Sequence, residues 1–492
     1  MSKKQFVIVK MLIIAILLML KTSTNGVVFA NENEFTNGNR DIAKIDEFMK
    51  NEIERLNIPG AALAIVKGNQ VEYMRGYGVS NPEGAEMTSQ TPIVLGSTTK
   101  SFTALAIMQL VEQGKINLEE PVLSYIPWFR VVDEAASKKI TIQHLLNQTS
   151  GLSTYDGQVA ISQGDQTLKE HVQSLEIIEL TYPVGDQYQY SNLNYNILGL
   201  VIEEVTKKSY KEYIREYIFK PLEMNNSYTD PNDVENNTIV EGYQTVFGFK
   251  VPTQQLVHEG TVSSGYIISS AEDMANCMIA QLNQGEFKGK NILAANAMSV
   301  VHHPSSFIGN DTYYAMGWEV NNEIISHNGW TENTYSKVLL DGEYGISLQI
   351  NSMDYFNLNE YDAIVSGINK LVHNEEPSLS NSNPFMKYVI IDLVLLIIVS
   401  LIVWSAFRTF KPGKRKITTS RKILTGLSIV VFNWLLPLIT LIGFPTLFGP
   451  LSTVKLFAPG IGHLVFLIPL LLLIVGFVKL GKVILKKNTL DA

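Results

Sequence analysis

Residues 94–110, "VLGSTTKSFTALAIMQL", place a serine and a lysine at the beginning of a long apolar helical pattern. Ser97 follows a glycine, and Lys100 comes three residues later, so both side chains lie on one face of the predicted helix. Serine is a preferred residue at helix N-termini, where its side chain caps free backbone N–H groups. A serine beside a lysine is also a pair that can act as nucleophile and base. This stretch alone leaves both interpretations of Ser97 open.

Composition excludes several classes of protein. The chain has 492 residues and a net charge of −8, and this acidic balance gives no reason to expect nucleic acid as a partner. Its single cysteine, Cys277, rules out an intrachain disulfide and lies in an amphipathic helical pattern, which favours a buried structural thiol. Hydrophobic residues make up 46% of the chain. Their excess lies at the two ends, where it predicts membrane segments.

The N-terminus, residues 1–30, has the pattern of a secretory signal peptide. Lys3, Lys4 and Lys10 precede an apolar run, and the sequence "VFA" ends at Ala30 with the small residues that a signal peptidase requires. The run of about ten apolar residues is too short to cross a bilayer. An uncleaved N-terminal anchor is the alternative.

Three apolar runs near the C-terminus are long enough to cross a bilayer as helices. They cover residues 388–407, 423–444 and 461–478. The loop 408–422 carries seven Lys or Arg residues, whereas the loop after the second run carries one. The positive-inside rule places loop 408–422 in the cytoplasm and everything before residue 388 outside the cell. We therefore expect a multi-pass protein of the cell membrane, anchored in the lipid bilayer by residues 388–492.

Residues 31–371 form the predicted exported domain, which a polar linker, residues 372–387, joins to the anchor. The patterns over residues 41–56 and 60–78 predict a helix and a β-hairpin. Residues 335–351 predict a second hairpin around an Asp-Gly turn. Helical patterns fill the sequence between the two hairpins. This arrangement predicts one α+β domain whose sheet joins N-terminal and C-terminal strands.

Two later motifs carry side chains that suit a catalytic cleft. Tyr190 and Asn192 lie at a turn before a helix, where a phenol can relay a proton if nearby cations lower its pKa. His327 and Gly329 precede the terminal hairpin, and the glycine lets a substrate approach the strand backbone. Taken alone, each of these residues is more often structural than catalytic. Similar strings recur at residues 452–455, 355–357 and 258–260.

The order Ser-x-x-Lys, Tyr-x-Asn, His-x-Gly resembles that of the penicillin-recognising serine hydrolases, in particular their class C β-lactamase-like branch. The segments "NIPGAALAIVKGNQVEYMRGYG", "ITIQHLLNQTSGL" and "YSNLNYNILGLVIEEVT" are also similar to typical segments of that family, in the same order. The resemblance covers about residues 41–370. It implies a β-lactamase-like α+β fold, in which an antiparallel sheet is flanked by helices and joined by a helical subdomain.

The resemblance also implies roles for individual residues. Ser97 would be the nucleophile of an acyl-enzyme, and Lys100 and Tyr190 would share its proton and deliver it to the leaving group. A free lysine, with a pKa near ~10.4, is a poor base, so burial or coupling must lower one of the two pKa values. Asn192 would orient Lys100 or the substrate. The oxyanion hole would use the N–H of Ser97 and one N–H of a strand beginning at about 330–333. No metal or other cofactor is implied.

One departure from the family pattern affects the expected substrate. Many members carry Lys-Thr-Gly in the third motif, and His327 here replaces that lysine. A permanent cation for a substrate carboxylate is lost, which suits a peptidase or esterase better than a β-lactamase. The other substrate-binding candidates are Gly329, Asn333 and His258, with Asn328 as a further polar group near the third motif.

The layout of signal peptide, class C-like domain and three spans resembles the prodrug-activating peptidases of colibactin and zwittermicin biosynthesis. Such an enzyme removes an N-acyl-D-asparagine cap from an inactive natural product, in maturation and self-resistance. The expected partner is then a small-molecule or peptidic prodrug, with an exporter as a second candidate partner. The three spans exceed what tethering needs, so they are expected to help form the substrate entrance or to dock that exporter.

Two other functions compete with this one. The first is a penicillin-binding protein, β-lactamase or esterase acting on cell-wall peptide or β-lactam. The second is a non-catalytic membrane sensor that uses the fold to bind a ligand.

Overall fold

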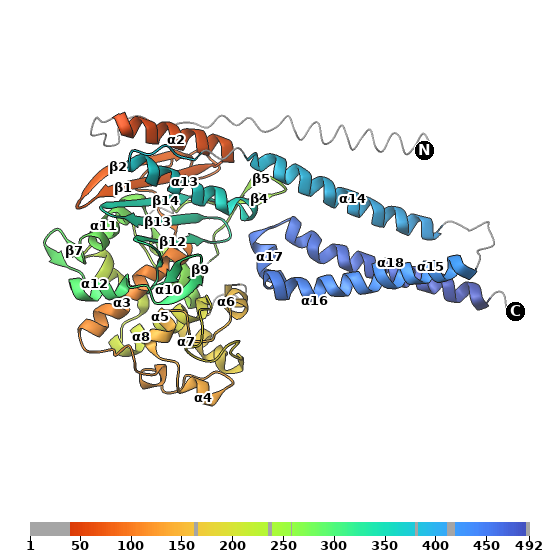
Figure 1. The fold of residues 1–492 in the computed structure, drawn as a ribbon, viewed down its shortest axis with the longest axis horizontal. Coiled ribbons are helices and arrows are strands. Elements are labelled where there is room, and N and C mark those ends of the chain that lie inside the picture. Colours follow the sequence, from red (N-terminus) through yellow and green to blue (C-terminus); the bar gives the residue numbers. More distant parts are fainter. Residues whose placement is uncertain are drawn as a thin grey trace.

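A sheet with helices on both faces adjoins a group of long C-terminal helices in the computed structural model of the chain (Figure 1). The structure describes residues 40–161, 166–234, 239–256, 258–378, 382–410 and 419–488. The predicted signal peptide, residues 1–30, lies outside the described residues, as does most of loop 408–422.

The main sheet has eight strands, and every neighbouring pair in it is antiparallel. In spatial order the strands are β2 (Gln70–Gly78), β1 (Gly60–Lys67), β14 (Tyr344–Ile350), β13 (Tyr335–Asp341), β12 (Ile324–Trp330), β11 (Glu319–Asn321), β10 (Thr312–Tyr314) and β9 (Ser306–Gly309).

The central pairing joins the two ends of the domain. Strand β1, "GAALAIVK", is buried along almost its whole length because helices cover both of its faces, and this explains its nearly continuous apolar sequence. It pairs with β14 from Ala61 opposite Ile350 to Lys67 opposite Tyr344. The predicted fold class is therefore confirmed, as is the prediction that N-terminal and C-terminal strands meet in one sheet.

Helices pack on both faces of the sheet. On one face, α2 (Arg40–Leu56) and α13 (Leu358–Val372) bury a core with Leu63 and Leu348. On the other face, α11 (Ala271–Leu282) packs against β1 and β14, and α3 (Thr99–Glu112) lies in the larger core. Residues 99–110 of α3 are all buried, so this helix can hold a side chain at its start in a fixed position.

A helical region below the sheet completes the domain (Figure 1). Its helices are α4 (Glu134–Ser137), α5 (Ile142–Leu146), α6 (Thr154–Ile161), α7 (Leu168–Gln173), α8 (Asn192–Thr206), α9 (Tyr210–Ile214), α10 (Val262–Gly265) and α12 (Ala295–Val301).

The short strands β4 (Gly242–Val246), β5 (Phe249–Thr253) and β15 (Ser352–Met353) form a small sheet beside the C-terminal helices. The remaining pairs are β3 (Ile93–Val94) with β6 (Ile268–Ser269) and β7 (Glu286–Phe287) with β8 (Lys290–Asn291).

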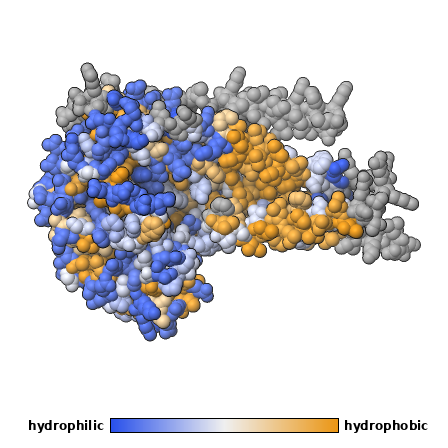
Figure 2. Space-filling model, in the orientation of Figure 1, coloured by the Kyte–Doolittle hydropathy of each residue, from blue (hydrophilic) through white to orange (hydrophobic). Residues whose placement is uncertain are grey.

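Three C-terminal segments are long and apolar enough to cross a membrane: Pro384–Thr409, Ile423–Leu447 and Ile461–Lys482. They overlap the three predicted spans. The helices involved are α14 (Pro384–Phe410), α15 (Thr419–Val430), a π-helical turn η9 (Val431–Leu435), α16 (Leu436–Phe448) and α18 (Ile461–Asn488). Their surface forms a broad apolar region next to the polar domain (Figure 2).

Two connecting segments differ from expectation. Helix α14 begins at Pro384, inside the predicted linker 372–387, because its apolar sequence continues a helix that Asn383 opens by accepting from the Met386 N–H. The segment between the second and third spans, expected as a loop, contains a further helix, α17 (Leu451–Phe457), which begins directly after Pro450.

Candidate active site

Ser97 lies on a tight helical turn immediately before α3. One 3₁₀ turn, η1 (Gly96–Thr98), carries the serine, and α3 continues directly from it. Ser97 is partly exposed, whereas Gly96 and Thr98 on either side are buried. The N-cap positions of η1 and α3 are Leu95 and Thr98, and neither side chain caps its helix. The interpretation of Ser97 as a helix cap is therefore wrong, because its hydroxyl turns toward a pocket.

The backbone before Ser97 is fixed by two side chains at the beginning of β13 and just before it. Thr334 Oγ1 donates to the carbonyl oxygen of Val94 at 2.8 Å, and Ser336 Oγ donates to that of Leu95 at 2.6 Å. On the following turn, Thr99 Oγ1 accepts from the Ile267 N–H at 3.1 Å. These bonds satisfy polar groups in a buried region and hold the serine in one place.

Two glycines allow the turn and strand β12 to approach at backbone distance. Gly96 has a φ of +59°, and a Cβ there would lie 2.3 Å from the Trp330 nitrogen. A Cβ on Gly329 would lie 2.0 Å from the Leu95 oxygen and 2.7 Å from the Ser97 nitrogen. Only glycine fits at either position. The close approach brings the backbone nitrogens of Ser97 and Trp330 to neighbouring positions.

The strand that makes this approach is not placed as expected. The sequence predicts that it begins at about 330–333, but β12 ends at Trp330 and β13 begins at Tyr335. Residues 331–334 form the turn between the two strands, because Thr331 and Thr334 bond to each other. The Thr331 N–H donates to the Thr334 oxygen at 3.0 Å, and the two hydroxyls lie 2.8 Å apart.

The amino group of Lys100 reaches Ser97 from inside the protein. Its Nζ lies 3.1 Å from Ser97 Oγ, and it donates to Asn192 Oδ1 at 2.8 Å and to the carbonyl oxygen of Ser264 at 2.6 Å. Lys100 is fully buried, with none of its surface exposed. Burial lowers the pKa of Lys100 well below its usual value, because the charged form loses its hydration.

Tyr190 also contacts Ser97. Its hydroxyl donates to Ser97 Oγ at 2.8 Å, and its ring packs edge-on against Tyr314. Burial raises the pKa of Tyr190 well above its usual value, so the phenol stays protonated. The direction is opposite to the lowered pKa considered from the sequence, because desolvation outweighs any cation nearby. Tyr190 is thus a hydrogen-bond donor in the resting site.

His327 is a neutral member of the site. Only 2% of its surface is exposed, and its Nδ1 bonds to the carbonyl oxygen of Asn328 at 2.5 Å, which makes Nδ1 the protonated nitrogen. Burial, with a further contribution from the charge of Lys100, lowers the pKa of His327 to about 3. The imidazole of His327 therefore stays uncharged at neutral pH. This agrees with the prediction from the sequence that this position has no permanent cation.

These groups line one pocket of about 300 Å³. Its walls come from the helical region, from the sheet and from α17. The lining residues are Ser97, Thr154, Gln158, Ile161, Tyr188, Tyr190, Asn192, Glu319, His327, Asn328, Trp330, Thr453 and Phe457. The sequence motifs thus meet in one cavity, with Gly329 directly behind Ser97.

Two of the predicted substrate-binding residues lie elsewhere. Asn333 is completely buried, and its amide donates to the Thr253 oxygen of β5 at 2.8 Å, so it holds the β12–β13 turn against that strand. His258 packs against Tyr266 with tilted rings, 4.6 Å between centroids, and lines a separate cavity. Neither side chain is among those that line the pocket of Ser97.

Some residues in and around the pocket were not predicted from the sequence motifs. Glu319 adds a carboxyl group from β11, and the Ser264 carbonyl completes the surroundings of Lys100. Burial raises the pKa of Glu319, and the charge of Lys337 acts in the opposite direction. Neither residue belongs to a recognisable string, so only their positions in the fold reveal them.

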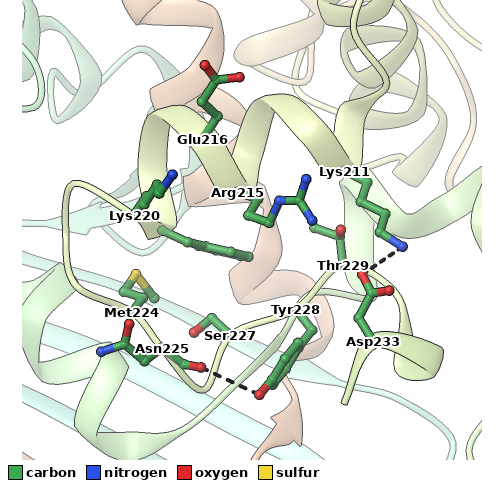
Figure 3. Close-up of a pocket in the computed structure, with 11 residues that line it drawn as sticks. Lys211, Arg215, Glu216, Lys220, Met224, Asn225, Ser227, Tyr228, Thr229 and Asp233 are labelled. Carbon is green, nitrogen blue, oxygen red and sulfur yellow. Dashed lines mark hydrogen bonds and ion pairs between the residues drawn. The ribbon is translucent and has the colours of Figure 1, made fainter. Parts of the chain in front are cut away.

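A larger cavity, of about 660 Å³, lies away from Ser97 between α9 and the segment 224–233 (Figure 3). One ion pair lies in its wall: Lys211 contacts Asp233 at 2.6 Å, and it also contacts the nearby Asp230 at 3.2 Å. None of the three motifs reaches it. The chemistry of this chain therefore centres on the smaller pocket.

Comparisons with known sequences agree with this geometry. The model of the Beta-lactamase family matches residues 43–364. Protein flp of Staphylococcus aureus (strain MW2) is 29% identical over 405 residues, which are 80% of this chain and 79% of that protein. The N-acetylmuramyl-L-alanine amidase of Bacillus subtilis (strain 168) is 25% identical over 360 residues, which are 63% of this chain and 80% of that protein.

Two solved structures have a similar fold. The octameric penicillin-binding protein homologue from Pyrococcus abyssi superimposes with a TM-score of 0.58 and 26% identity, over 68% of this chain and 78% of that one. FmtA from Staphylococcus aureus superimposes with a TM-score of 0.57 and 23% identity, over 74% and 96%. The likeness to FmtA is one of fold alone.

Proposed function

Since the chain belongs to the Beta-lactamase family of serine hydrolases, we propose that it is a membrane-anchored serine peptidase that works through an acyl-enzyme. Ser97 is the nucleophile of this proposal, Lys100 its base and Tyr190 the acid. The observation that carries it is the contact of both Lys100 and Tyr190 with one hydroxyl, Ser97 Oγ.

The hydrogen bonds of Lys100 support its role as a base. A neutral amine has two N–H groups and one lone pair, and Asn192 Oδ1 and the Ser264 oxygen can only accept. The two N–H groups are therefore used, and the lone pair faces Ser97 Oγ at 3.1 Å. Lys100 can take the serine proton as the Oγ attacks a carbonyl carbon.

The other groups complete the cycle. In the proposed acylation the bond from Ser97 Oγ to the acyl carbon forms, the bond to the leaving nitrogen breaks, and Tyr190 gives that nitrogen a proton. The Lys100 ammonium then restores the Tyr190 proton through the hydrogen-bonded network. The backbone N–H groups of Ser97 and Trp330 stabilise the oxyanion. Water later releases the acyl group by the reverse sequence.

The charges of the pocket favour a particular class of substrate. A neutral His327 offers no cation to a carboxylate, and Glu319 adds an acidic group to the wall. A substrate with a neutral or cationic group at this end is therefore preferred over one that ends in a carboxylate. This supports the removal of an N-acyl-D-asparagine cap from a prodrug, a substrate whose side chain is a neutral amide. The same proposal places the catalytic domain outside the cell.

A cell-wall substrate is the second candidate. It is favoured by the similarity to the Bacillus subtilis N-acetylmuramyl-L-alanine amidase and to a penicillin-binding protein homologue. An amide between a sugar-linked lactyl group and alanine also lacks a carboxylate at the bond that breaks, so the neutral pocket accommodates it as well.

The test compares four compounds on membranes that contain the full chain. These are an N-acyl-D-asparaginyl amide, its L-asparaginyl counterpart, an N-acetylmuramyl peptide and a chromogenic cephalosporin. Turnover of the D-asparaginyl amide alone supports prodrug cleavage, and turnover of the muramyl peptide alone supports the second candidate. If only the cephalosporin is hydrolysed, both are wrong. The Ser97→Ala variant is the control and should lose all turnover; activity that survives this change contradicts the assignment of the nucleophile.

A further inference from the structure

One wall of the catalytic pocket comes from the membrane anchor. Helix α17 connects the second and third spans, and its Thr453 and Phe457 line the pocket together with Ser97. The exposed fractions of these two side chains are 7% and 4%. They are thus enclosed by the catalytic domain, although the sequence places them far beyond it.

Contacts with three elements of the catalytic domain hold α17 in place. Thr453 Oγ1 donates to the carbonyl oxygen of Gln158, on α6, at 3.1 Å. The Leu456 oxygen accepts from the side-chain amide of Gln244, on β4. The Phe457 ring packs edge-on against Trp330, the last residue of β12, with 5.1 Å between centroids. Since Trp330 follows Gly329 directly, the anchor reaches the strand that supports Ser97.

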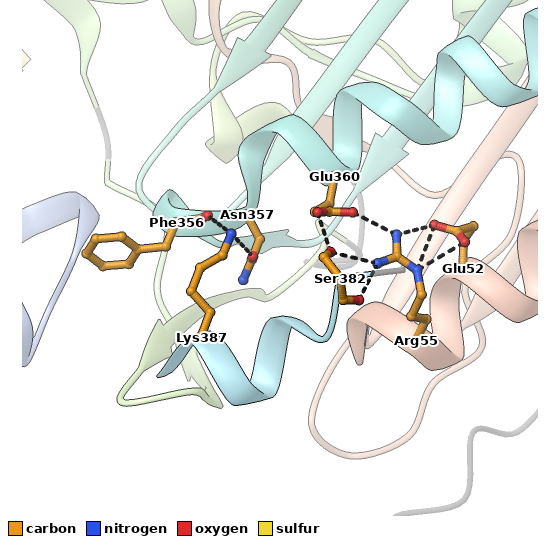
Figure 4. A network of polar contacts seen from close by, with 7 residues as sticks. All are labelled: Glu52, Arg55, Phe356, Asn357, Glu360, Ser382 and Lys387. Atoms are coloured by element: carbon orange, nitrogen blue, oxygen red, sulfur yellow. Dashed lines mark hydrogen bonds and ion pairs between the residues drawn. The ribbon is translucent and has the colours of Figure 1, made fainter. Parts of the chain in front are cut away.

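A second set of contacts fixes the beginning of α14 (Figure 4). Arg55 Nη1 donates to the Ser382 oxygen at 3.3 Å, and Arg55 also pairs with Glu360 at 3.0 Å. Lys387 donates to the Phe356 oxygen and to Asn357 Oδ1, each at 2.8 Å. The described part of the predicted linker 372–387 is therefore attached to the domain at its anchor end. The catalytic domain is thus attached to the C-terminal helices at two places, at α17 and at the beginning of α14. It therefore cannot rotate about one flexible connection.

The elements around this junction expose apolar surface toward the anchor. Phe249 and Val251 of β5 are 37% and 39% exposed. They line an apolar cavity of about 630 Å³ between the β4–β5 hairpin and α14. Figure 2 shows the apolar surface of the spans continuing up to the polar domain. Such a surface at the outer end of a membrane span suits contact with lipid chains.

We propose that α17 is part of the substrate site, with Phe457 and Thr453 in contact with a substrate whose apolar chain lies in the outer leaflet of the bilayer. The helix forms both the pocket wall and the outer end of two spans. A lipophilic amide or ester can therefore keep its chain in the membrane while its polar group reaches Ser97. The aromatic pair Phe457 and Trp330 then packs on the first methylenes of the chain. This inference rests on the proposed nucleophilic role of Ser97.

The test uses two fluorophosphonates that react with an active serine, one with an ethyl and one with a hexadecyl chain. The full-length protein is reconstituted in phosphatidylglycerol vesicles, and the rate of Ser97 labelling is measured for both probes. The variants are Phe457→Ala, Phe457→Leu and, as a matched control on the exposed face of the same helix, Ser452→Ala. The labelling rate with the ethyl probe shows whether Ser97 is still reactive in each variant.

In Phe457→Ala the ratio of long-chain to short-chain labelling rates should fall about tenfold, the factor that corresponds to ~1.4 kcal/mol of lost apolar contact. Phe457→Leu should keep most of the ratio, and Ser452→Ala all of it. An unchanged ratio in Phe457→Ala overturns the inference, as does a loss that is equal for both probes. Failure of both probes to label Ser97 in the unaltered protein instead overturns the proposed function.

Discussion

The amino group of Lys100 and the hydroxyl of Ser97 lie 3.1 Å apart, at the point where the buried beginning of α3 meets a pocket. Asn192 and the Ser264 carbonyl occupy the other bonding directions of the amine. The lysine is thus oriented by acceptors rather than neutralised by a carboxylate. Burial without a counter-charge is what lowers its pKa.

The pH dependence of acylation tests the charge state of Lys100. Since the base must be neutral, the acylation rate should reach its plateau at a pH below the ordinary lysine pKa and fall as the pH drops through the lowered pKa of Lys100. Lys100→Arg keeps a permanent charge and should lower the rate by ~10² to 10⁴ at every pH. Stopped-flow acylation measures both. A wild-type rate that keeps rising up to the ordinary lysine pKa of ~10.4 contradicts the proposal.

The burial of the Lys100 amine should also make the free energy of unfolding depend on pH. Between its lowered folded pKa and the unfolded value near ~10.4, the unfolded chain binds one more proton at Lys100 than the folded chain. The contribution of this group to the free energy of unfolding therefore rises with pH in that window, by at most about 1.4 kcal/mol per pH unit. Lys100→Met removes this dependence. Thermal unfolding in detergent across the window should show the wild type gaining stability relative to the variant, and parallel curves would contradict the burial argument.

The close approach of strand β12 to the Ser97 turn makes Gly329 sensitive to any side chain. In Gly329→Ala the new Cβ would lie 2.0 Å from the Leu95 oxygen and 2.7 Å from the Ser97 nitrogen, so the strand must move away. We expect a loss of ~1–3 kcal/mol of stability from overpacking and a fall of ~10² or more in acylation rate as the oxyanion site opens. Gly265→Ala is the matched control, because its Cβ would have only one ordinary contact, at 3.9 Å to Gly96. Similar rates for the two variants would contradict the role of this approach.

The carboxyl group of Glu319 should influence which substrates the pocket accepts. Glu319→Gln removes a negative charge while keeping the volume, so kcat/KM for a carboxylate-bearing substrate should rise about fivefold, corresponding to ~1 kcal/mol of repulsion in a partly solvated site. For the matching uncharged amide the change should be below about twofold. Steady-state kinetics with such a pair measures the difference. An equal effect on both substrates would mean that Glu319 acts on the fold and not on the substrate.

Much of the fold follows from local sequence patterns. The alternation in the two hairpins, the Asp-Gly turn and the helix over residues 41–56 all depend on neighbouring residues, so the predicted α+β class and the antiparallel sheet are confirmed. The three apolar spans depend only on length and composition. The resemblance is confirmed at the level of the Beta-lactamase family, whose model covers the same region.

Local patterns do not determine where a side chain lies relative to residues that are far away in the sequence. His258 and His327 belong to similar sequence strings, yet one packs against Tyr266 beside another cavity and the other lines the pocket of Ser97. Asn333 holds a turn against β5 because Thr253 lies opposite it. The direction of the Tyr190 pKa shift depends on burial, which the chain acquires only on folding.

The residues that can do chemistry here, and the segments able to cross a membrane, can be identified before the fold is known, because residue type, order and apolar length are local properties. Folding is what buries Lys100 without a counter-charge, brings Glu319 into the pocket, and adds α17 to the pocket wall, where Phe457 packs against Trp330. These are contacts between residues far apart in the chain, and they exist only because the sheet, the helices and the anchor pack against one another.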